Sequence, residues 1–331
     1  MNFELTKTQQ LFKQMVREFA EKEVKPLAAE VDDLERFPRE TVDKMAALGL
    51  MGIPFPRELG GAGGDMIMYT IAVEELSRVC GTTGVILSAH TSLCAMPIFM
   101  FGTPDQKAKY LPKLASGEWI GAFGLTEPNA GTDASAQQTT AVLEDDHYVL
   151  NGNKIFITNA GEANVYVVAA MTDKSQGVKG ISTFIVESTF PGFSIGKKEH
   201  KMGIRGSATC ELIFENCIVP KENLLGAQGK GFGIAMHTLD GGRIGIAAQA
   251  LGLAEGALQA TIDYVKERKQ FGRSIAQFQN TQFQLADMHT RMQAAQYLVY
   301  AAACKKQNHE DYSMDASMAK LFAAEAASDV T

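Results

Sequence analysis

The sequence predicts an α+β protein in which a middle β domain separates two helical regions. Apolar residues recur at helical spacing up to Gly117, strand-like segments with turn residues follow, and a helical pattern returns from Lys230. The chain has 331 residues, 46% of them apolar and 21% charged, which is ordinary for a soluble globular protein of two or three domains. We therefore expect three domains, the last of them cut short: 1–120 (helical), 121–226 (β) and 227–331 (helical).

The N-terminal helical region opens with apolar residues at helical spacing between Leu5 and Leu34, with Pro26 as a break or kink. Pro104, directly after a threonine, is typical of a capped helix start, and Gly117 is typical of a helix stop. Further helices are expected at 38–48, 67–80, 83–101 and 104–116.

The most apolar stretch of the chain runs from Val85 to Phe101. Polar residues, among them His90, and a proline, Pro97, interrupt it. Such interruptions favour a buried helix of a large core over a membrane span, so no membrane association is expected.

The β domain is expected to begin after Gly117, where the period changes and turn residues separate short apolar runs. These runs lie at 119–126, 139–143, 147–150, 154–158, 165–171, 181–186 and 210–214. Long helices are then expected near 230–268 and 277–307, and a third opens near Ser313. Thr331 falls within that third helix without a cap or stop signal, which we interpret as a chain cut short.

The charge and cysteine patterns exclude several function classes. The net charge is −7 and no long basic run is present, so nucleic-acid binding is not expected. The five cysteines lack Cys-x-x-Cys spacing and the six histidines lack ligand spacing, so neither a disulfide framework nor a metal site is expected. The segment Met1–Leu5 lacks the features of a signal or transit peptide, so a cytoplasmic protein is expected, or a mitochondrial matrix protein if a transit peptide was removed.

Two segments of the β domain carry chemistry. Gly124–Asp133 reads Gly-Leu-Thr-Glu-Pro-Asn-Ala-Gly-Thr-Asp, and such turn-rich segments are most often plain connections. Here, however, hydroxyls at Thr126 and Thr132 stand beside successive backbone N–H groups, which can hold a flavin pyrimidine edge and a phosphate. Phe156–Asn159, which reads Phe-Ile-Thr-Asn, follows after one predicted hairpin, and the two segments together form a long and specific pattern.

On these two segments the sequence resembles the acyl-CoA dehydrogenase family, and within it the bacterial short-chain, butyryl-CoA type. The resemblance covers the whole chain and is strongest at 121–133, 154–161, 201–206 and 237–252. It implies a helical N-terminal domain, a β-barrel-like middle domain and a C-terminal helical bundle. It also implies an oxidoreductase that uses FAD to desaturate a short-chain acyl-CoA to the trans-2-enoyl-CoA, and that passes the electrons to electron-transferring flavoprotein.

The resemblance, carried over residue by residue, implies FAD contacts on both segments. Those on the first segment would line the isoalloxazine ring and the pyrophosphate. The residues concerned are Phe123, Leu125, Thr126, Gly131, Thr132, Phe156, Ile157 and Thr158. Phe156 stands where many relatives have Trp and would stack on the flavin, whereas Thr158 would hydrogen-bond near flavin N5. Considered alone, an aromatic such as Phe156 is more commonly a buried strand residue.

A third segment resembles the part of the family that reaches the FAD of a neighbouring subunit. The matching residues are Arg268, Gln270, Phe271 and Gln279. Without the resemblance, this segment would be interpreted as a charged turn between helices. With it, Arg268 becomes a pyrophosphate ligand, and a homotetramer built as a dimer of dimers is implied.

The helical segment Leu239–Gly245 resembles the family's acyl-CoA contact. The resemblance implies substrate binding by Thr132, Asp240 and Arg243. The double glycine at 241–242 costs a helix about 1 kcal/mol per residue relative to alanine. Close approach of a ligand or of a neighbouring helix is therefore the expected reason for it.

The resemblance places no catalytic residue within this chain. Desaturation needs a carboxylate that removes an α-proton while a hydride leaves the β-carbon for the flavin. Some relatives carry this Glu at the position of Gly242, which cannot be a base, and short-chain relatives carry it in a Tyr-Glu-Gly segment expected beyond Thr331. Glu325 is interpreted as a solvent-facing or packing residue, not as the base.

Catalysis by these 331 residues alone is therefore in doubt, and two alternatives stand beside the dehydrogenase. The first is an acyl-CoA oxidase, which would differ by rapid reoxidation of the flavin by oxygen. The second is a non-catalytic flavoprotein or scaffold of the same fold, which the missing base favours.

Overall fold

The computed structural model describes residues 4–331, and the chain divides into two compact units. Unit 1 comprises the chain up to Ala29, Asp65–Val85 and Arg243–Thr331, and unit 2 comprises Glu30–Gly64 and Ile86–Gly242. Residues 1–3, which begin the predicted N-terminal domain, lie outside the described residues. The three predicted domain boundaries stay a prediction.

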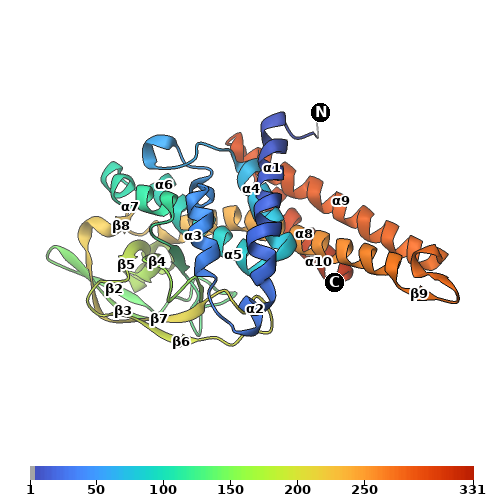
Figure 1. The fold of residues 1–331 in the computed structure, drawn as a ribbon. Coiled ribbons are helices and arrows are strands. Elements are labelled where there is room, and N and C mark those ends of the chain that lie inside the picture. The colour runs from blue at the N-terminus through green and yellow to red at the C-terminus, as the bar shows by residue number, and fades with distance from the viewer. Residues whose placement is uncertain (1–3) are drawn as a thin grey trace. The chain divides into compact units, whose positions relative to one another are not determined.

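The helices follow the predicted pattern closely (Figure 1). They are α1 Lys7–Phe19, α2 Ala28–Asp33, α3 Arg39–Ala47, α4 Met66–Val79, α5 Gly81–Ser88, α6 Met96–Phe101, α7 Pro104–Ser116, α8 Gly231–Glu267, α9 Gln279–Gln307 and α10 Ser313–Val330. Threonines at the caps of α1 and α7, Thr6 and Thr103, form capping boxes with the glutamines three residues later. Gly117 ends α7 in the left-handed conformation at φ 78°, which confirms the predicted stop.

The predicted break at Pro26 is confirmed, although the interruption is wider than one residue. A π-helical turn, Ala20–Val24, and a 3₁₀ turn, Lys25–Leu27, separate α1 from α2. Proline lacks the N–H that a continuous helix would need at this point, so the backbone changes its hydrogen-bond pattern around it.

The predicted helix 83–101 is a continuous run in which a π-helical segment, Ala89–Ala95, joins α5 to α6. Within the described residues, Gly81–Phe101 is the one helix long and apolar enough to cross a membrane, and 72% of its apolar window is buried inside the protein. Burial to this extent confirms the interpretation as a core helix.

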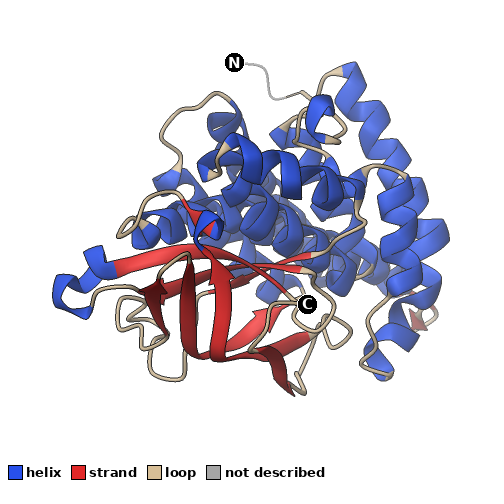
Figure 2. Cartoon of the chain, turned by 90° about the vertical axis from the view of Figure 1, so that its left-hand side faces the viewer, coloured by secondary structure: helices blue, strands red, loops and turns tan. Residues whose placement is uncertain are grey.

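Unit 2 is built on one eight-stranded sheet (Figure 2). Its strands are β1 Gly121–Gly124, β2 Thr140–Glu144, β3 His147–Thr158, β4 Val165–Met171, β5 Ile181–Glu187, β6 Phe193–Lys198, β7 Thr209–Pro220 and β8 Leu224–Leu225. The order is β6-β7-β3-β2-β4-β5-β8, and β1 pairs in parallel with β4. The strand β4, which is fully buried, and the strand β5, which is buried except at Glu187, pair along their whole length and supply the centre of its core.

Two strand predictions are wrong. The segments 147–150 and 154–158 belong to one strand, β3, because β7 pairs with both and a β-bulge absorbs the polar Asn-Gly-Asn stretch between them. The sequence also predicted no strand at β6, where the alternation of Phe193 and Ile195 with polar neighbours is too short to mark a strand and two lysines follow it.

In unit 1, α4 packs against both α1 and α9, and α10 packs against α9. A short hairpin, β9 Lys269–Gln270 and β10 Arg273–Ser274, lies between α8 and α9 in the chain. The predicted third C-terminal helix is confirmed as α10, which begins at Ser313 as expected.

Candidate cofactor site

A β-bulge in β3 presents an aromatic side chain in a strained conformation. The pairing of β3 with β7 shifts its register between Lys154 and Ile157, and Phe156 lies between them with φ +60°. A bulky side chain rarely adopts this region, which costs about 1–3 kcal/mol and persists only where the surrounding structure enforces it. The Phe156 ring is 59% exposed, so the alternative interpretation of Phe156 as a buried strand aromatic is wrong.

The loop that follows β1 lies against this bulge. The carbonyl oxygen of Thr126 accepts a hydrogen bond of 2.9 Å from the N–H of Ile155, the residue before Phe156. The two sequence segments proposed to embrace a flavin therefore meet in unit 2, as their pattern predicted. Farther along the same loop, Gly131 and Thr132 are exposed.

The predicted cofactor residues of unit 2 differ in what they can offer a ligand. Phe156, Gly131 and Thr132 are exposed, and Thr126 and Thr158 are half-buried. The side chains of the remaining three are buried in the protein core, so only their backbone groups could reach a ligand. These three are Phe123, Leu125 and Ile157.

A charged residue that sequence reasoning missed lies beneath the loop. Lys154 is fully buried, and its ammonium group donates to the carbonyl oxygen of Leu125 at 3.1 Å and to Glu127 Oε1 at 2.7 Å. It also donates to the side-chain oxygen of Gln137. Burial lowers the pKa of Lys154 to about 8, against the opposing effect of the Glu127 carboxylate. A lysine inside an apolar strand segment was the available signal, because lysine is rarely buried without a partner.

The start of β1 is held by two buried polar side chains. His90 Nδ1 accepts from the N–H of Gly121 at 3.1 Å, and its Nε2 lies 3.0 Å from the carbonyl oxygen of Leu114, which assigns the proton to Nε2. Burial lowers the pKa of His90 to about 4, so the ring is neutral at physiological pH. Asn159 Nδ2 donates to the carbonyl oxygens of Gly121 and Ile86, both at 3.2 Å.

The third group of predicted cofactor residues lies in unit 1, in and around the β9–β10 hairpin. Arg268, Gln270, Phe271 and Gln279 are all exposed, and Phe271 at the tip is 94% exposed. The hairpin is held by its own contacts: the N–H of Ile275 donates to the carbonyl oxygen of Arg268, and the Arg273 guanidinium lies 4.3 Å from the centre of the Phe278 ring. The hairpin therefore presents these groups outward.

The predicted substrate residues Asp240 and Arg243 lie one turn apart on α8, and both are half-buried. At Gly242, a Cβ atom would lie 2.7 Å from Leu93 Cδ2 of the π-helical segment. Close approach of a neighbouring helix therefore accounts for this glycine, in agreement with one of the two expected reasons. Glu325 is exposed on α10, as expected.

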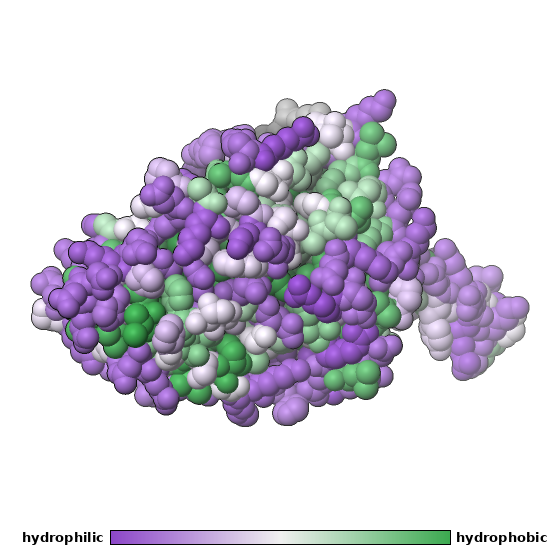
Figure 3. Space-filling view, turned by 60° about the vertical axis from the view of Figure 1, so that its left-hand side comes forward, coloured by the Kyte–Doolittle hydropathy of each residue, from purple (hydrophilic) through white to green (hydrophobic). Residues whose placement is uncertain are grey.

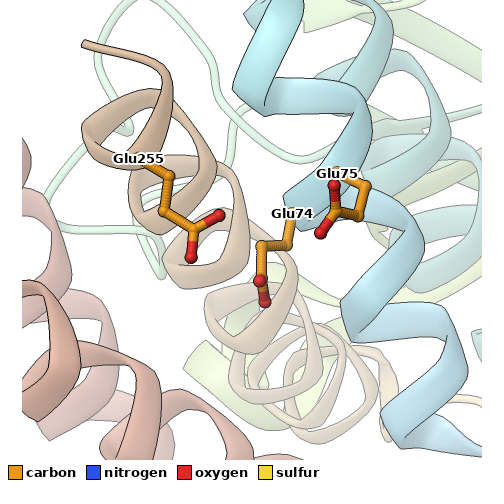
Figure 4. A group of neighbouring side chains, drawn as sticks. All are labelled: Glu74, Glu75 and Glu255. Atoms are coloured by element: carbon orange, nitrogen blue, oxygen red, sulfur yellow. The ribbon is translucent and has the colours of Figure 1, made fainter. Parts of the chain in front are cut away.

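Three acidic side chains of unit 1 gather at one point (Figure 4). Glu74 and Glu75 come from α4 and Glu255 comes from α8, with one carboxylate oxygen of each within 4.8 Å of the others. Burial, followed by the charge of Glu74, raises the pKa of Glu255 to about 8. Glu255 is therefore protonated at neutral pH, which relieves the repulsion within the group.

Cations and a hydroxyl surround the other two carboxylates. Lys13 Nζ lies 2.6 Å from Glu74 Oε1, and the Tyr300 hydroxyl donates to Glu74 Oε2 at 2.7 Å. The Arg17 guanidinium donates two hydrogen bonds, of 2.8 and 2.7 Å, to the Glu75 carboxylate. Although burial opposes it, these neighbours lower the pKa of Glu75. Because cations already pair with Glu74 and Glu75, we interpret these contacts as an ion-pair network that joins α1 to α4, with Glu255 of α8 close beside it.

The fold and the site define a class of protein. A strained, exposed aromatic ring on a bulged strand, beside a hydroxyl-bearing loop of the same sheet, is a surface suited to a flat, phosphate-bearing cofactor. A sheet domain with long helices before and after it in the chain carries this surface.

The comparison with family models identifies the class more closely. The acyl-CoA dehydrogenase N-terminal, middle and C-terminal domain models match residues 6–118, 122–217 and 229–331. The chain belongs to the acyl-CoA dehydrogenase family, whose members are oxidoreductases and flavoproteins.

Relatives support this membership along the whole chain. The chain is 65% identical to a short-chain-specific acyl-CoA dehydrogenase of Clostridium acetobutylicum, over 100% of its own length and 87% of the relative. The structure of butyryl-CoA dehydrogenase from Megasphaera elsdenii is 52% identical, with a TM-score of 0.98 over 100% of this chain and 87% of that one. A chain solved in work on the electron transferring flavoprotein of Acidaminococcus fermentans is 61% identical, with a TM-score of 0.99 over the same shares.

Proposed function

We propose that the protein catalyses the FAD-dependent α,β-dehydrogenation of a short-chain acyl-CoA and passes the electrons to electron-transferring flavoprotein. The observation that carries the proposal is the hydrogen bond that joins the Gly124–Asp133 loop, at Thr126, to the bulge of β3 at Ile155, next to the exposed Phe156. The substrate class rests on the 65% identity to a short-chain-specific acyl-CoA dehydrogenase. The electron acceptor rests on the chain solved with the electron transferring flavoprotein.

The described residues fit a flavin. The Phe156 ring offers a flat apolar face, and Thr126 and Thr158, both half-buried, carry hydroxyls that could donate to or accept from the edge of a flavin ring. Exposed Gly131 and Thr132, farther along the same loop, leave room for a phosphate group near the backbone. When bound, FAD supplies the hydride acceptor of the reaction.

The role of this chain in the chemistry is to bind and to orient. Phe156 would stack on the cofactor, Thr158 would fix its edge, and Asp240 and Arg243 would hold polar parts of the acyl-CoA. Stacking and directional hydrogen bonds hold the reacting atoms in line, which is one of the contributions that a protein makes to the chemistry of its cofactor.

We further infer a homotetramer and a cytoplasmic location. The exposed β9–β10 hairpin supports assembly, because it carries Arg268 and Phe271 on a projecting turn. Helices α9 and α10 also expose large apolar side chains. Figure 3 shows apolar patches on one face of the molecule, among a mainly hydrophilic surface. The exposed apolar residues of these two helices include Phe283, Tyr297, Met314, Met318 and Leu321. The bacterial origin of the relatives with 65% and 52% identity supports the location.

The reverse reaction is a second candidate. The chain is also 50% identical, over its full length, to an acryloyl-CoA reductase (NADH) of Anaerotignum propionicum. The same groups would then bind an enoyl-CoA and a reduced flavin. Reoxidation of the reduced flavin by crotonyl-CoA faster than by oxygen would favour this direction, and rapid reoxidation by oxygen alone would favour an oxidase.

The visible spectrum of the purified protein, recorded without oxygen before and after addition of butyryl-CoA, tests the proposal. Bleaching of a bound-flavin band is the expected result for a dehydrogenase, and it would mean that residues 1–331 contain a base. A band that shifts without bleaching would indicate a cofactor and substrate site that lacks its base. A protein that takes up no flavin under any reconstitution condition would contradict the proposal.

A further inference from the structure

We propose that Lys154 positions the cofactor loop, by tying Leu125–Thr139 to strand β3 so that the loop and the Phe156 ring face the same ligand. The inference rests on the proposed function and concerns the binding of its flavin. Lys154 itself would touch no part of the cofactor, because its side chain is fully buried beneath the loop.

The geometry at the ammonium group shows a complete set of partners. Lys154 has three N–H donors, and three acceptors of the loop receive them: the Leu125 carbonyl oxygen, Glu127 Oε1 and the side-chain oxygen of Gln137. These acceptors lie near both ends of the loop. One side chain therefore holds the point where the chain leaves β1 and the point where it approaches β2.

The partners of Lys154 carry the constraint into the loop backbone. Glu127 accepts from the backbone N–H groups of Gln138 at 2.6 Å and Thr139 at 3.1 Å. The side-chain amide of Gln137 donates to the carbonyl oxygens of Leu125 at 3.1 Å and Ala134 at 3.0 Å. Apart from one bridge between Glu127 and Ala130, the described part of the loop has no strand or helix, so these side chains hold its shape.

The network also joins the two cofactor-facing segments. Lys154 stands two residues before Phe156 and immediately before the bulge, pointing inward where Phe156 points outward. The next residue, Ile155, donates its N–H to Thr126 of the loop. A change in the position of the Lys154 side chain would therefore change the separation of Thr126 from the Phe156 ring.

Lys154 and Glu127 form a buried ion pair, so the charged state of each group depends on the other. Burial opposes the charge on both groups, whereas each charge favours the other, and the pKa of Glu127 stays below its usual value. Removal of Lys154 alone would leave a carboxylate buried without a cation, and Glu127 would turn away and release Gln138 and Thr139.

Three variants test the proposal: Lys154→Met, the charge-balanced double variant Lys154→Met/Glu127→Gln, and Gln137→Ala. The control is Lys13→Met, which removes a half-buried lysine that pairs with two buried carboxylates, Glu74 and Glu75, of unit 1. Each protein is stripped of flavin and titrated with FAD by fluorescence. Hydrogen exchange then reports on residues 125–139, and thermal melting reports on stability.

We expect the dissociation constant for FAD to rise about 10- to 100-fold in the Lys154 variants, the range seen in metal sites when groups that orient the binding residues without touching the bound ion are removed. The loop amides should exchange faster, and Gln137→Ala should show a smaller change in the same direction. Lys13→Met should lower the melting temperature while its affinity for FAD stays that of the wild type.

Unchanged FAD affinity in the double variant or in Gln137→Ala would overturn the inference, even if the melting temperature falls, since Lys154 would then be only a structural ion pair. If Lys154→Met alone fails to fold, the other two variants decide. A wild-type protein that binds no FAD would instead contradict the proposed function, so the two failures are distinguishable.

Discussion

Phe156 combines an unfavourable backbone conformation with an exposed apolar ring, two features that stability alone does not favour. Strained residues of this kind concentrate at ligand sites because the structure around them enforces the geometry. The neighbouring residues show how this is achieved: Lys154 and Ile157 are buried on either side of the bulge and fix the strand around it.

Replacement of Phe156 by glycine should lower the affinity for FAD with little effect on the stability of the fold. Glycine removes the strain of the positive φ, but it also raises the conformational entropy of the unfolded chain. The two effects oppose each other, so the free energy of unfolding should stay within about 1 kcal/mol of the wild type. FAD affinity should fall because the stacking face is gone. Urea unfolding and FAD titration measure the two effects, and a loss of stability above about 3 kcal/mol would indicate that the ring is a packing residue.

The raised pKa of Glu255 predicts an unusual pH dependence of the free energy of unfolding. Its pKa in the folded protein is raised to about 8 by burial and by Glu74, above the ordinary 4.5. The folded state therefore keeps a proton that the unfolded state loses, so this contribution to stability is complete below about pH 4.5 and is lost as the pH rises through about 8. Glu255→Gln should remove that loss.

Urea unfolding at pH 6 and pH 9 provides the measurement. The wild type should lose more stability between the two values than Glu255→Gln does. Glu267→Gln, an exposed position on the same helix, serves as the control and should behave as the wild type. Equal pH dependence in all three proteins would contradict the raised pKa.

Between secondary-structure elements, buried side chains attach the sheet to the helices of unit 2. The π-helical segment Ala89–Ala95 places His90 where it accepts from the first N–H of β1 and meets the end of α7. Asn159, at the end of β3, bonds to the same residue, Gly121. The start of the cofactor loop is thus set by two side chains that come from different elements.

Removal of the His90 ring should destabilise unit 2. His90→Ala would leave the buried Gly121 N–H without its acceptor, at about 1–3 kcal/mol, whereas the Leu114 carbonyl oxygen would keep the hydrogen bond that it accepts from the Gly117 N–H. We expect a loss of unfolding free energy of about 2–5 kcal/mol, including the cavity that the ring leaves. His289→Ala, at an exposed position on α9, is the control, and an equal, small effect of both changes would show that water replaces the ring without cost.

At the scale of the whole molecule, the exposed hairpin predicts that cofactor binding depends on assembly. Arg268 and Phe271 lie on a turn of unit 1, whereas the loop and the bulge lie in unit 2. If a second copy supplies the hairpin, dilution should release subunits and FAD together. Light scattering and flavin fluorescence over the same concentration series measure this.

A matched pair of variants sharpens that experiment. Phe271→Ser should weaken FAD retention and assembly without a loss of helical content, because the ring is 94% exposed within the chain. Val178→Ser, at another exposed apolar residue, should change neither property. A monomer that retains FAD at all concentrations would contradict the prediction.

Much of this architecture could be predicted from local patterns. Helices such as α4 and α7 can be predicted from their apolar spacing and caps, and the loop after β1 can be predicted from its turn residues. Strand β3 was divided wrongly because Asn151–Asn153 resembles a turn until β7 pairs with it. Local patterns carry no information on such pairing, since the partner strand lies more than 50 residues away.

The family, the order of helical and β regions, and the two segments proposed to face a cofactor could be predicted from the sequence, because each depends on contiguous residues. Only the tertiary structure decided that Lys154 lies beneath the loop, that Phe156 turns outward, and that Glu255 meets Glu74. These features depend on strand register and on packing between distant segments. Burial then sets the pKa of Lys154 and Glu255, and burial is a property of the folded chain alone.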